Sequence, residues 1–178
     1  MSTSDEPAPR SPAGVTLRRV GYADPVAQHL IERVQQEYVL RYGGRDAAVV
    51  DPAEFSPPLG TFLVAEVDGV PAACAGWRAH APEDGARAVA ELKRMYVEPA
   101  FRRRGLAALL LTEVERTAAA AGHRRLVLNT GDRQPEAIAL YARCGYRPVP
   151  GYGVYARSPG AVFLGKDLTD RMEDAWAS

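Results

Sequence analysis

The residues best suited to chemistry form the run Arg102 to Ala107 (RRRGLA), which follows an apolar strand and opens an amphipathic helix. The first turn of a helix leaves backbone N–H groups without partners, and the helix dipole makes that end electropositive. The positive charge of arginine side chains is unfavourable at this electropositive end unless an anion is bound there. Gly105 has no Cβ and lets the backbone approach a ligand closely. These features predict a phosphate-binding site, although a glycine that only directs the chain is the alternative.

Periodicity and turn residues around this run predict the elements that position it. Asp24-Pro25 supplies an N-cap and a first-turn proline, and Gly43-Gly44 supplies a stop, so a helix is expected between them. Asp68-Gly69 between two β-prone runs predicts a hairpin. We expect strands at residues 14–20, 61–67, 71–80, 88–97, 125–130, 146–149 and 161–164, helices at residues 24–42, 104–121 and 135–144, and a turn at residues 82–85.

The order of these elements indicates the fold class. Three antiparallel strands in succession are followed by helix, strand, helix and strand, which predicts an α+β fold with a mixed α/β sheet. Residues 1–14 are rich in Ser, Pro, Ala and Asp and are expected to be disordered. Residues 15–168 are expected to form a single domain, and residues 169–178 are expected to form a polar tail.

Composition narrows the class of protein. The chain has 178 residues, and its 22 Lys and Arg balance its 22 Asp and Glu. A nucleic-acid binder usually has a basic excess, so that class is disfavoured. No run reaches the ~20 apolar residues that cross a bilayer, and the N-terminus lacks the apolar core of a signal peptide, so we expect a cytoplasmic protein with no membrane partner. Cysteine and histidine do not cluster with ligand spacing, so no metal site is predicted.

Two motifs carry a family resemblance. The first is Arg102-x-x-Gly105-x-Ala107, which follows a strand that ends in Val97-x-Pro99. The second is the run 137–146 (AIALYARCGY), in which an alanine and a tyrosine precede Cys-Gly-Tyr. Together they resemble the GNAT superfamily, the N-acetyltransferases related to the histone acetyltransferases. The resemblance implies a GNAT-like fold, with a central, twisted, mostly antiparallel sheet of six to seven strands that contains a splayed pair and is flanked by about four helices.

The resemblance implies acetyl-CoA as the co-substrate. The loop at residues 102–107 would cradle the pyrophosphate, and the backbone of the splayed strand end would bind the pantetheine arm. Ala107 replaces a commoner glycine, and Gln134 stands where many members have asparagine. Asn129 and Gln134 could instead cap their loop. The expected cofactor-binding residues are Met95, Tyr96, Val97, Arg102, Arg103, Arg104, Gly105, Leu106, Ala107, Asn129 and Gln134.

The resemblance also implies two catalytic residues. Glu91 lies where histone-acetylating relatives carry a general base, and strand alternation predicts that it shares a face with Lys93, Met95 and Val97. A carboxylate there could take the proton of an ammonium group, directly or through water. The alternatives are water alone as the base, or a glutamate that only pairs with a neighbouring cation. Tyr141 would protonate the departing thiolate, and the alternative is a tyrosine packed in the core.

Aromatic residues are expected to line the acceptor pocket. In the family this pocket is built from the early helix and the loop after it, the strand that here carries Trp77, and the region after the last helix. Each aromatic residue could instead belong to the core or to a dimer contact. The candidates are Tyr38, Tyr42, Phe55, Trp77, Tyr152 and Tyr155.

The resemblance therefore implies an acyltransferase that moves an acetyl group from acetyl-CoA to a primary amine, expected to be that of a small molecule, by direct attack in a ternary complex. An amino acid, a polyamine or an amine antibiotic would fit. The alternatives are a protein or peptide N-acetyltransferase and, from another class, a non-catalytic acyl-CoA-binding module. A homodimer is expected from the resemblance alone.

Overall fold

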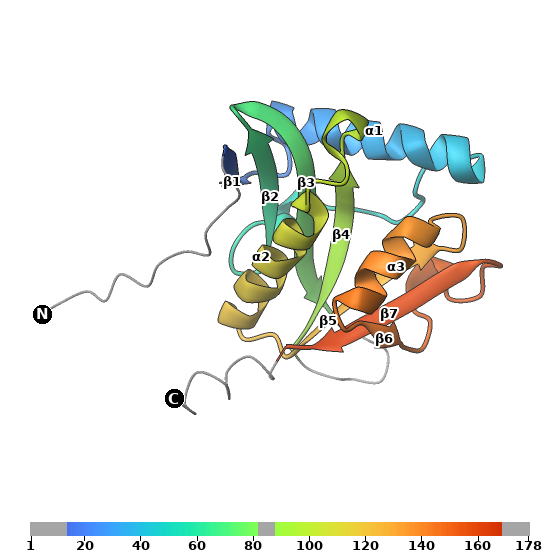
Figure 1. Cartoon of the computed structure of the whole chain (residues 1–178). Coiled ribbons are helices and arrows are strands. Elements are labelled where there is room, and N and C mark those ends of the chain that lie inside the picture. The colour runs from blue at the N-terminus through green and yellow to red at the C-terminus, as the bar shows by residue number, and fades with distance from the viewer. Residues whose placement is uncertain (1–13, 82–87, 169–178) are drawn as a thin grey trace, which may run out of the picture.

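The computed structural model describes residues 14–81 and 88–168, and Figure 1 shows how their elements are arranged. The strands are β1 (Val15–Val20), β2 (Gly60–Val67), β3 (Val70–His80), β4 (Val89–Val97), β5 (Arg125–Gly131), β6 (Arg147–Pro148) and β7 (Ala161–Asp167). The α-helices are α1 (Pro25–Tyr42), α2 (Leu106–Ala120) and α3 (Pro135–Arg143), and the 3₁₀ helices are η1 (Pro52–Phe55), η2 (Pro99–Phe101) and η3 (Gly153–Tyr155). The predicted turn at residues 82–85, the lead-in before residue 14 and the tail at 169–178 lie outside the described residues.

The strands form one seven-stranded sheet in the order β1-β2-β3-β4-β5-β7-β6. β4 and β5 pair in parallel, and all other neighbouring strands are antiparallel. The predicted α+β class with a mostly antiparallel sheet is therefore confirmed. No helix in the ranges 14–81 and 88–168 is long and apolar enough to cross a membrane.

The helices cover both faces of the sheet, with α2 and α3 in front and α1 behind in Figure 1. The α1 side is packed by buried residues of α1 and of the central strands, among them Leu30, Val34, Phe62, Cys74 and Tyr96. The opposite side joins α2, α3 and the sheet through a second cluster, which includes Leu63, Trp77, Leu92, Leu110, Val114, Leu128 and Tyr141. Because both faces are covered, β2 and β3 are largely apolar and buried on both sides instead of alternating with polar residues.

The ends of the helices follow from particular residues. The side chain of Asp24 caps α1, and Gly43 ends that helix with a φ of 78°. α2 begins at Leu106, later than predicted, because the chain just before it is not helical. Arg103 has a φ of 65° and Gly105 a φ of 77°, both in the left-handed region that a right-handed helix cannot use.

A β-bulge interrupts β4. The register between β3 and β4 shifts between Cys74 and Gly76, so that two residues of β4, Arg94 and Met95, oppose one residue of β3. Arg94 has a φ of 59°, which is uncommon for a residue with a side chain. The bulge therefore places a buried arginine in the middle of the central sheet.

The bulge shows that the predicted alternation along β4 was wrong. Leu92 before the bulge and Met95 and Val97 after it all contact the cluster beneath α2. Glu91 and Lys93 therefore point to the α1 side, opposite Met95 and Val97. Strict alternation had predicted one shared face, but an extra residue in a strand reverses the side of every residue beyond it.

Candidate active site

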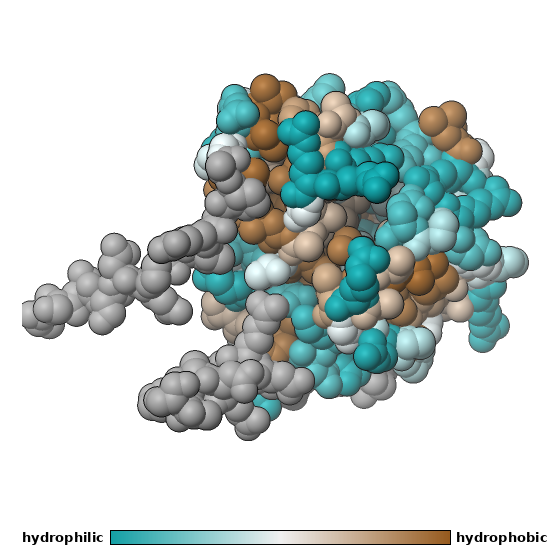
Figure 2. All heavy atoms as spheres, in the orientation of Figure 1, coloured by the Kyte–Doolittle hydropathy of each residue, from teal (hydrophilic) through white to brown (hydrophobic). Residues whose placement is uncertain are grey.

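β4 and β5 separate after a short paired segment. Their parallel pairing joins Val89–Glu91 to Arg125–Val127, and beyond these residues the two strands diverge. Residues 92–97 and 128–131 then line a cavity of about 1140 Å³. Figure 2 shows a hollow in the surface between α1 and α3 that hydrophilic residues border. The diverging strand edges supply backbone N–H and C=O groups that are not used in a β4–β5 ladder.

The loop before α2 forms one end of the cavity. Its lining residues are Arg102, Arg103, Gly105, Leu106 and Ala107. A Cβ built at Gly105 would meet no atom of the described residues within 4 Å, so the positive φ, and not a lack of space, is what favours glycine there. The first N–H groups of α2 have no helical acceptor. This end of the cavity is therefore suited to an anion.

The arginines of the loop have different surroundings. Arg102 donates from Nε to the Val97 carbonyl at 2.9 Å and from a terminal nitrogen to Glu37 at 2.8 Å. It thereby joins the end of β4 to α1. Arg104 does not line the cavity, and its guanidinium lies 5.4 Å from the centre of the Phe101 ring. Two of the three predicted arginines therefore border the cavity.

The other predicted cofactor residues also border the cavity, and they are Met95, Tyr96, Val97, Asn129 and Gln134. The Asn129 side chain donates to the carbonyls of Thr130 and Val162, each at 3.3 Å. Gln134 donates to the Tyr42 hydroxyl at 3.1 Å. Both polar side chains thus have protein partners, which agrees with the loop-capping alternative for each.

Tyr141 lies on α3 at the wall of the cavity and is 5% exposed. Its ring meets the ring of Tyr146 edge to face, with 5.6 Å between the centroids. Burial raises the pKa of the Tyr141 phenol above its ordinary value. The phenol therefore keeps its proton at neutral pH and can donate it to a group in the cavity.

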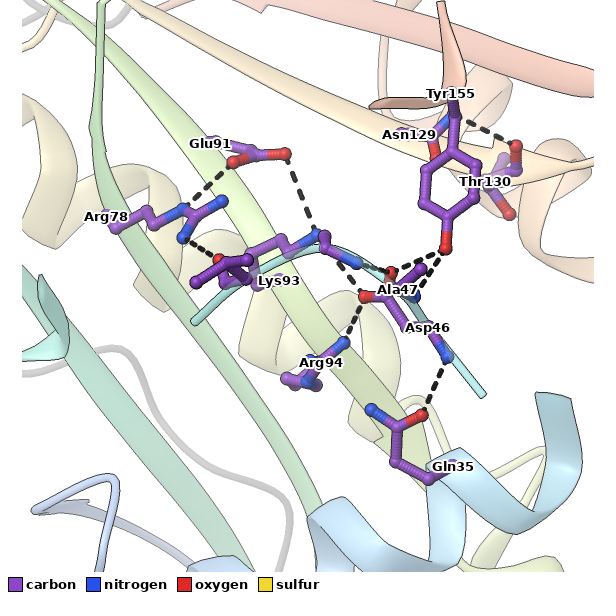
Figure 3. Close-up of polar contacts among 12 residues, drawn as sticks. Gln35, Asp46, Ala47, Arg78, Glu91, Lys93, Arg94, Asn129, Thr130 and Tyr155 are labelled. Carbon is purple, nitrogen blue, oxygen red and sulfur yellow. Dashed lines mark hydrogen bonds and ion pairs between the residues drawn. The ribbon is translucent and has the colours of Figure 1, made fainter. Parts of the chain in front are cut away.

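Glu91 is buried behind the cavity wall and does not line the cavity. Its carboxylate accepts a hydrogen bond from Arg78 Nε at 3.0 Å, and Lys93 Nζ lies 3.8 Å away. Figure 3 shows Lys93 between Glu91 and the loop after α1. The structure therefore does not bring this predicted base to the cavity, and its position fits the alternative of a glutamate paired with cations.

The sequence analysis missed Asp46, which lines the cavity in the loop after α1. Its carboxylate accepts hydrogen bonds from the Ala48 N–H at 2.9 Å, Tyr155 Oη at 3.0 Å and Lys93 Nζ at 3.5 Å. It also forms a direct ion pair with Arg94 (Figure 3). Burial alone would raise the pKa of Asp46, but the neighbouring cations and the Ala48 N–H lower it to about 2. Asp46 is therefore ionised at neutral pH.

The cluster around Asp46 joins three parts of the chain. Arg94 belongs to the bulge of β4, Tyr155 belongs to η3, and the backbone N–H of Asp46 donates to Gln35 of α1 at 2.9 Å. A lone aspartate in a polar loop has no recognisable spacing to the other residues of the site. Only the bulge, which turns Arg94 toward the α1 side, brings the partners together.

The predicted aromatic residues separate into two groups. Tyr38, Tyr42 and Tyr155 line the cavity. Trp77 does not, because its side chain lies in the cluster beneath α2 and its indole N–H donates to Thr117 at 2.9 Å. Strand alternation decides this outcome, since it turns Trp77 to the α2 face of β3.

Two further aromatic candidates do not line the cavity either. Phe55 is 1% exposed and stacks on Tyr22, with 4.7 Å between the ring centroids. Tyr152 packs on His80 and Phe163, at centroid distances of 4.6 Å and 5.1 Å, and does not line the cavity. Aromatic type alone did not distinguish the pocket from the core.

Comparisons with known proteins agree with this geometry. The family profile described as the acetyltransferase (GNAT) family matches residues 27–146. The chain is 32% identical over 154 residues to a protein of Azospirillum brasilense named IAA acetyltransferase, which covers 86% of this chain and 98% of the relative. It is 32% identical over 150 residues to the uncharacterized N-acetyltransferase YjgM of Escherichia coli (strain K12), which covers 80% of this chain and 86% of the relative.

Solved structures share the fold. A protein of Klebsiella pneumoniae subsp. pneumoniae MGH 78578 is 27% identical with a TM-score of 0.69, over 86% of this chain and 97% of that protein. The protein yncA of Salmonella typhimurium, solved with its cofactor acetyl-CoA, is 25% identical with a TM-score of 0.65. That match covers 88% of this chain and 95% of yncA.

Proposed function

Because the chain belongs to the GNAT family of acetyltransferases, we propose that it transfers the acetyl group of acetyl-CoA to a primary amine of a small molecule. The observation that carries the proposal is the divergence of β4 and β5 around a cavity with two chemically different ends. One end is the basic loop before α2, and the other contains Asp46 and three tyrosines. Two substrates that enter from these ends can meet and react directly, without an acylated protein.

The residues of the cavity fit the polar parts of acetyl-CoA. Arg103 and the first backbone N–H groups of α2 would hold the pyrophosphate, and the left-handed Gly105 keeps that approach open. The backbone of residues 95–97 would hydrogen bond the pantetheine arm, since this edge of β4 has no partner in β5. When bound, acetyl-CoA supplies a thioester whose carbonyl carbon is attacked and whose sulfur leaves.

Two groups of the chain would assist the transfer. A backbone N–H on the free edge of β4 would donate to the thioester oxygen and stabilise the charge that develops on it. Tyr141 would give its proton to the departing sulfur as the carbon–sulfur bond breaks. After the attack the nitrogen loses its second proton to water, and water returns a proton to Tyr141, so that the free thiol and the N-acetylated amine leave the site.

The attacking amine must lose a proton, and water in the cavity is the acceptor that the contacts favour. The Glu91 carboxylate forms an ion pair with Arg78 and lies behind the wall of the cavity. Asp46 has a pKa of about 2 and accepts several hydrogen bonds, which makes it a weak base. Because neither carboxylate is suited to act as the base, we propose that the amine releases its proton to water.

A contact beside the acceptor end of the cavity favours a small acceptor over a protein lysine. The Tyr155 hydroxyl accepts a hydrogen bond from the Ala47 N–H at 2.6 Å and donates to Asp46 at 3.0 Å. This contact joins η3 to the loop after α1. A lysine presented by a folded protein would have to pass between these loops, whereas a free small molecule would not need to displace them.

Release of free thiol from acetyl-CoA in the presence of a panel of primary amines tests the proposal. We expect amine-dependent, saturable release and a product that is heavier by one acetyl group in mass spectrometry. Binding of acetyl-CoA without turnover of any amine would contradict the proposal and support an acyl-CoA-binding module. Turnover of lysine peptides but not of free amines would favour a protein acceptor instead.

A further inference from the structure

Lys93 is a cation on the acceptor side of the cavity. It precedes the bulge of β4, points to the α1 side and lines the cavity, with 11% of its side chain exposed. Its Nζ lies 3.5 Å from Asp46 Oδ2 and 3.8 Å from Glu91 Oε1. Both distances exceed the 2.7–2.9 Å of a short charge-assisted hydrogen bond. An ammonium group has three N–H donors, so Lys93 keeps the capacity to bind another acceptor atom.

The two carboxylates near Lys93 already have closer partners. Arg78 Nε donates to Glu91 at 3.0 Å, and Arg94 forms a direct ion pair with Asp46. Arg78 also contacts Glu54 at its outer side. Figure 3 shows the row of alternating charges, with Lys93 in its centre. Lys93 is therefore not required as the sole counter-ion of either carboxylate.

Arg45 provides a contrast on the same wall of the cavity. Its two terminal guanidinium nitrogens donate to Glu32 at 2.9 Å and 2.8 Å, and its side chain is 55% exposed. Those donors are used by a short bidentate pair that faces solvent. Lys93, in contrast, is largely buried, and its contacts to carboxylates of the described residues are long, so an anion in the cavity would gain more from Lys93 than from Arg45.

Three tyrosines also line the cavity at this end. Tyr38 and Tyr42 of α1 lie with their ring centroids 6.4 Å apart, and Tyr155 faces the same cavity. Such rings suit an apolar or aromatic part of a ligand. A polyamine would instead bring further positive charge next to Lys93 and Arg94, which is unfavourable.

We propose that the acceptor is an amine that also carries a carboxylate, as an apolar amino acid does, and that Lys93 binds this carboxylate. The proposal rests on the proposed acetyl transfer and names the substrate class of the same cavity. With its carboxylate held at Lys93 and its apolar part between the tyrosines, the acceptor would have a defined orientation. Its amino group would then be available to the thioester.

Matched amines that differ only by a carboxylate test the proposal. L-Leucine is compared with 3-methylbutylamine, and L-phenylalanine with 2-phenylethylamine, by thiol release in wild type, Lys93→Met and Arg45→Met. We expect the preference in kcat/KM for the carboxylate-bearing amine to fall by about tenfold or more in Lys93→Met and to stay unchanged in Arg45→Met. Comparing the ratio between variants cancels the different basicity of the amines. A wild type that prefers the amines without a carboxylate would overturn the proposal.

Binding of the products separates this proposal from the proposed function. N-Acetyl-L-leucine and N-(3-methylbutyl)acetamide are titrated calorimetrically into the protein with coenzyme A, which needs no turnover. Tighter binding of the carboxylate product, lost in Lys93→Met, would support the role of Lys93 even if the rates of transfer were low. Equal binding of the two products, or no binding of the carboxylate product, would overturn it. Absence of transfer to every amine, with the carboxylate product still bound at Lys93, would refute only the proposed function.

Discussion

Replacing Tyr141 by phenylalanine tests the role of its hydroxyl group. The hydroxyl makes no hydrogen bond to another residue in the described ranges, so its removal should change the free energy of unfolding by less than about 1 kcal/mol. A positioned general acid contributes a factor of about 10² to 10⁴, so kcat should fall at least about 100-fold. That loss corresponds to about 2.7 kcal/mol of transition-state stabilisation. Steady-state thiol release gives kcat, and calorimetry should show unchanged affinity for acetyl-CoA.

Tyr146→Phe is the matched control. The Tyr146 hydroxyl donates to the buried Glu115 at 3.1 Å, and Lys166 holds the same carboxylate at 2.9 Å. Loss of a hydrogen bond to a charged group should lower the free energy of unfolding by about 2 kcal/mol. The ring that packs against Tyr141 remains, so kcat should change little while the protein is folded.

The two variants should therefore differ in stability and in rate. Tyr141→Phe should lower kcat with little change in stability, whereas Tyr146→Phe should lower stability with little change in kcat. Urea unfolding measures the first quantity and thiol release the second. If Tyr141→Phe kept the wild-type kcat, or lost rate only in proportion to lost stability, Tyr141 would be a core residue and not the proton donor. Equal rate losses in both variants would point to general disturbance of the packing between the two rings.

Three further substitutions test other parts of the account. Glu91→Gln should leave kcat and its pH dependence within about twofold, because Arg78 already holds the carboxylate; a loss of about 100-fold would restore Glu91 as the base. Asp46→Asn should lower the free energy of unfolding by about 2 kcal/mol at pH 7, because folding lowers the pKa of Asp46 from 3.8 to about 2. This difference from wild type should shrink as the pH falls from about 4 to about 2, and a difference independent of pH in urea unfolding would exclude the charge as its cause. Trp77→Phe should cost about 1–3 kcal/mol of stability and leave the KM for the amine unchanged, whereas a raised KM in folded protein would return Trp77 to the acceptor pocket.

Much of the fold could be predicted because local chemistry and tertiary structure agree. Asp68 and Gly69 both have positive φ, at 49° and 80°, which is the backbone that a tight hairpin needs and that these residue types tolerate. Asp24 and Gly43 mark the ends of α1 for equally local reasons. The loop at residues 102–107 could be predicted to border a binding cavity. Its glycine permits a positive φ, and its place before a helix leaves the first backbone N–H groups of that helix without helical acceptors.

The acceptor side could not be predicted to the same extent. The bulge at Arg94 depends on how two strands pair, and no turn residue in β4 signals it. Because the bulge was not predicted, Lys93 and Met95 were assigned to the same face of the sheet. For the same reason, the ion pair between Arg94 and Asp46 could not be predicted. Trp77 could not be assigned for a related reason, since the side of the sheet to which it points decides between core and pocket.

Binding of acetyl-CoA at the loop before α2 is the central claim, and calorimetric titration of acetyl-CoA tests it most directly. Gly105→Glu is compared with Gly122→Glu, because both glycines have positive φ, at 77° and 92°, and neither has an atom within 4 Å of an added Cβ. Of these two glycines, Gly105 lines the cavity, whereas Gly122 follows the opposite end of α2. We predict binding on the order of micromolar for wild type and Gly122→Glu and its loss in Gly105→Glu. No binding by wild type, or equal binding by the two variants, would contradict the account.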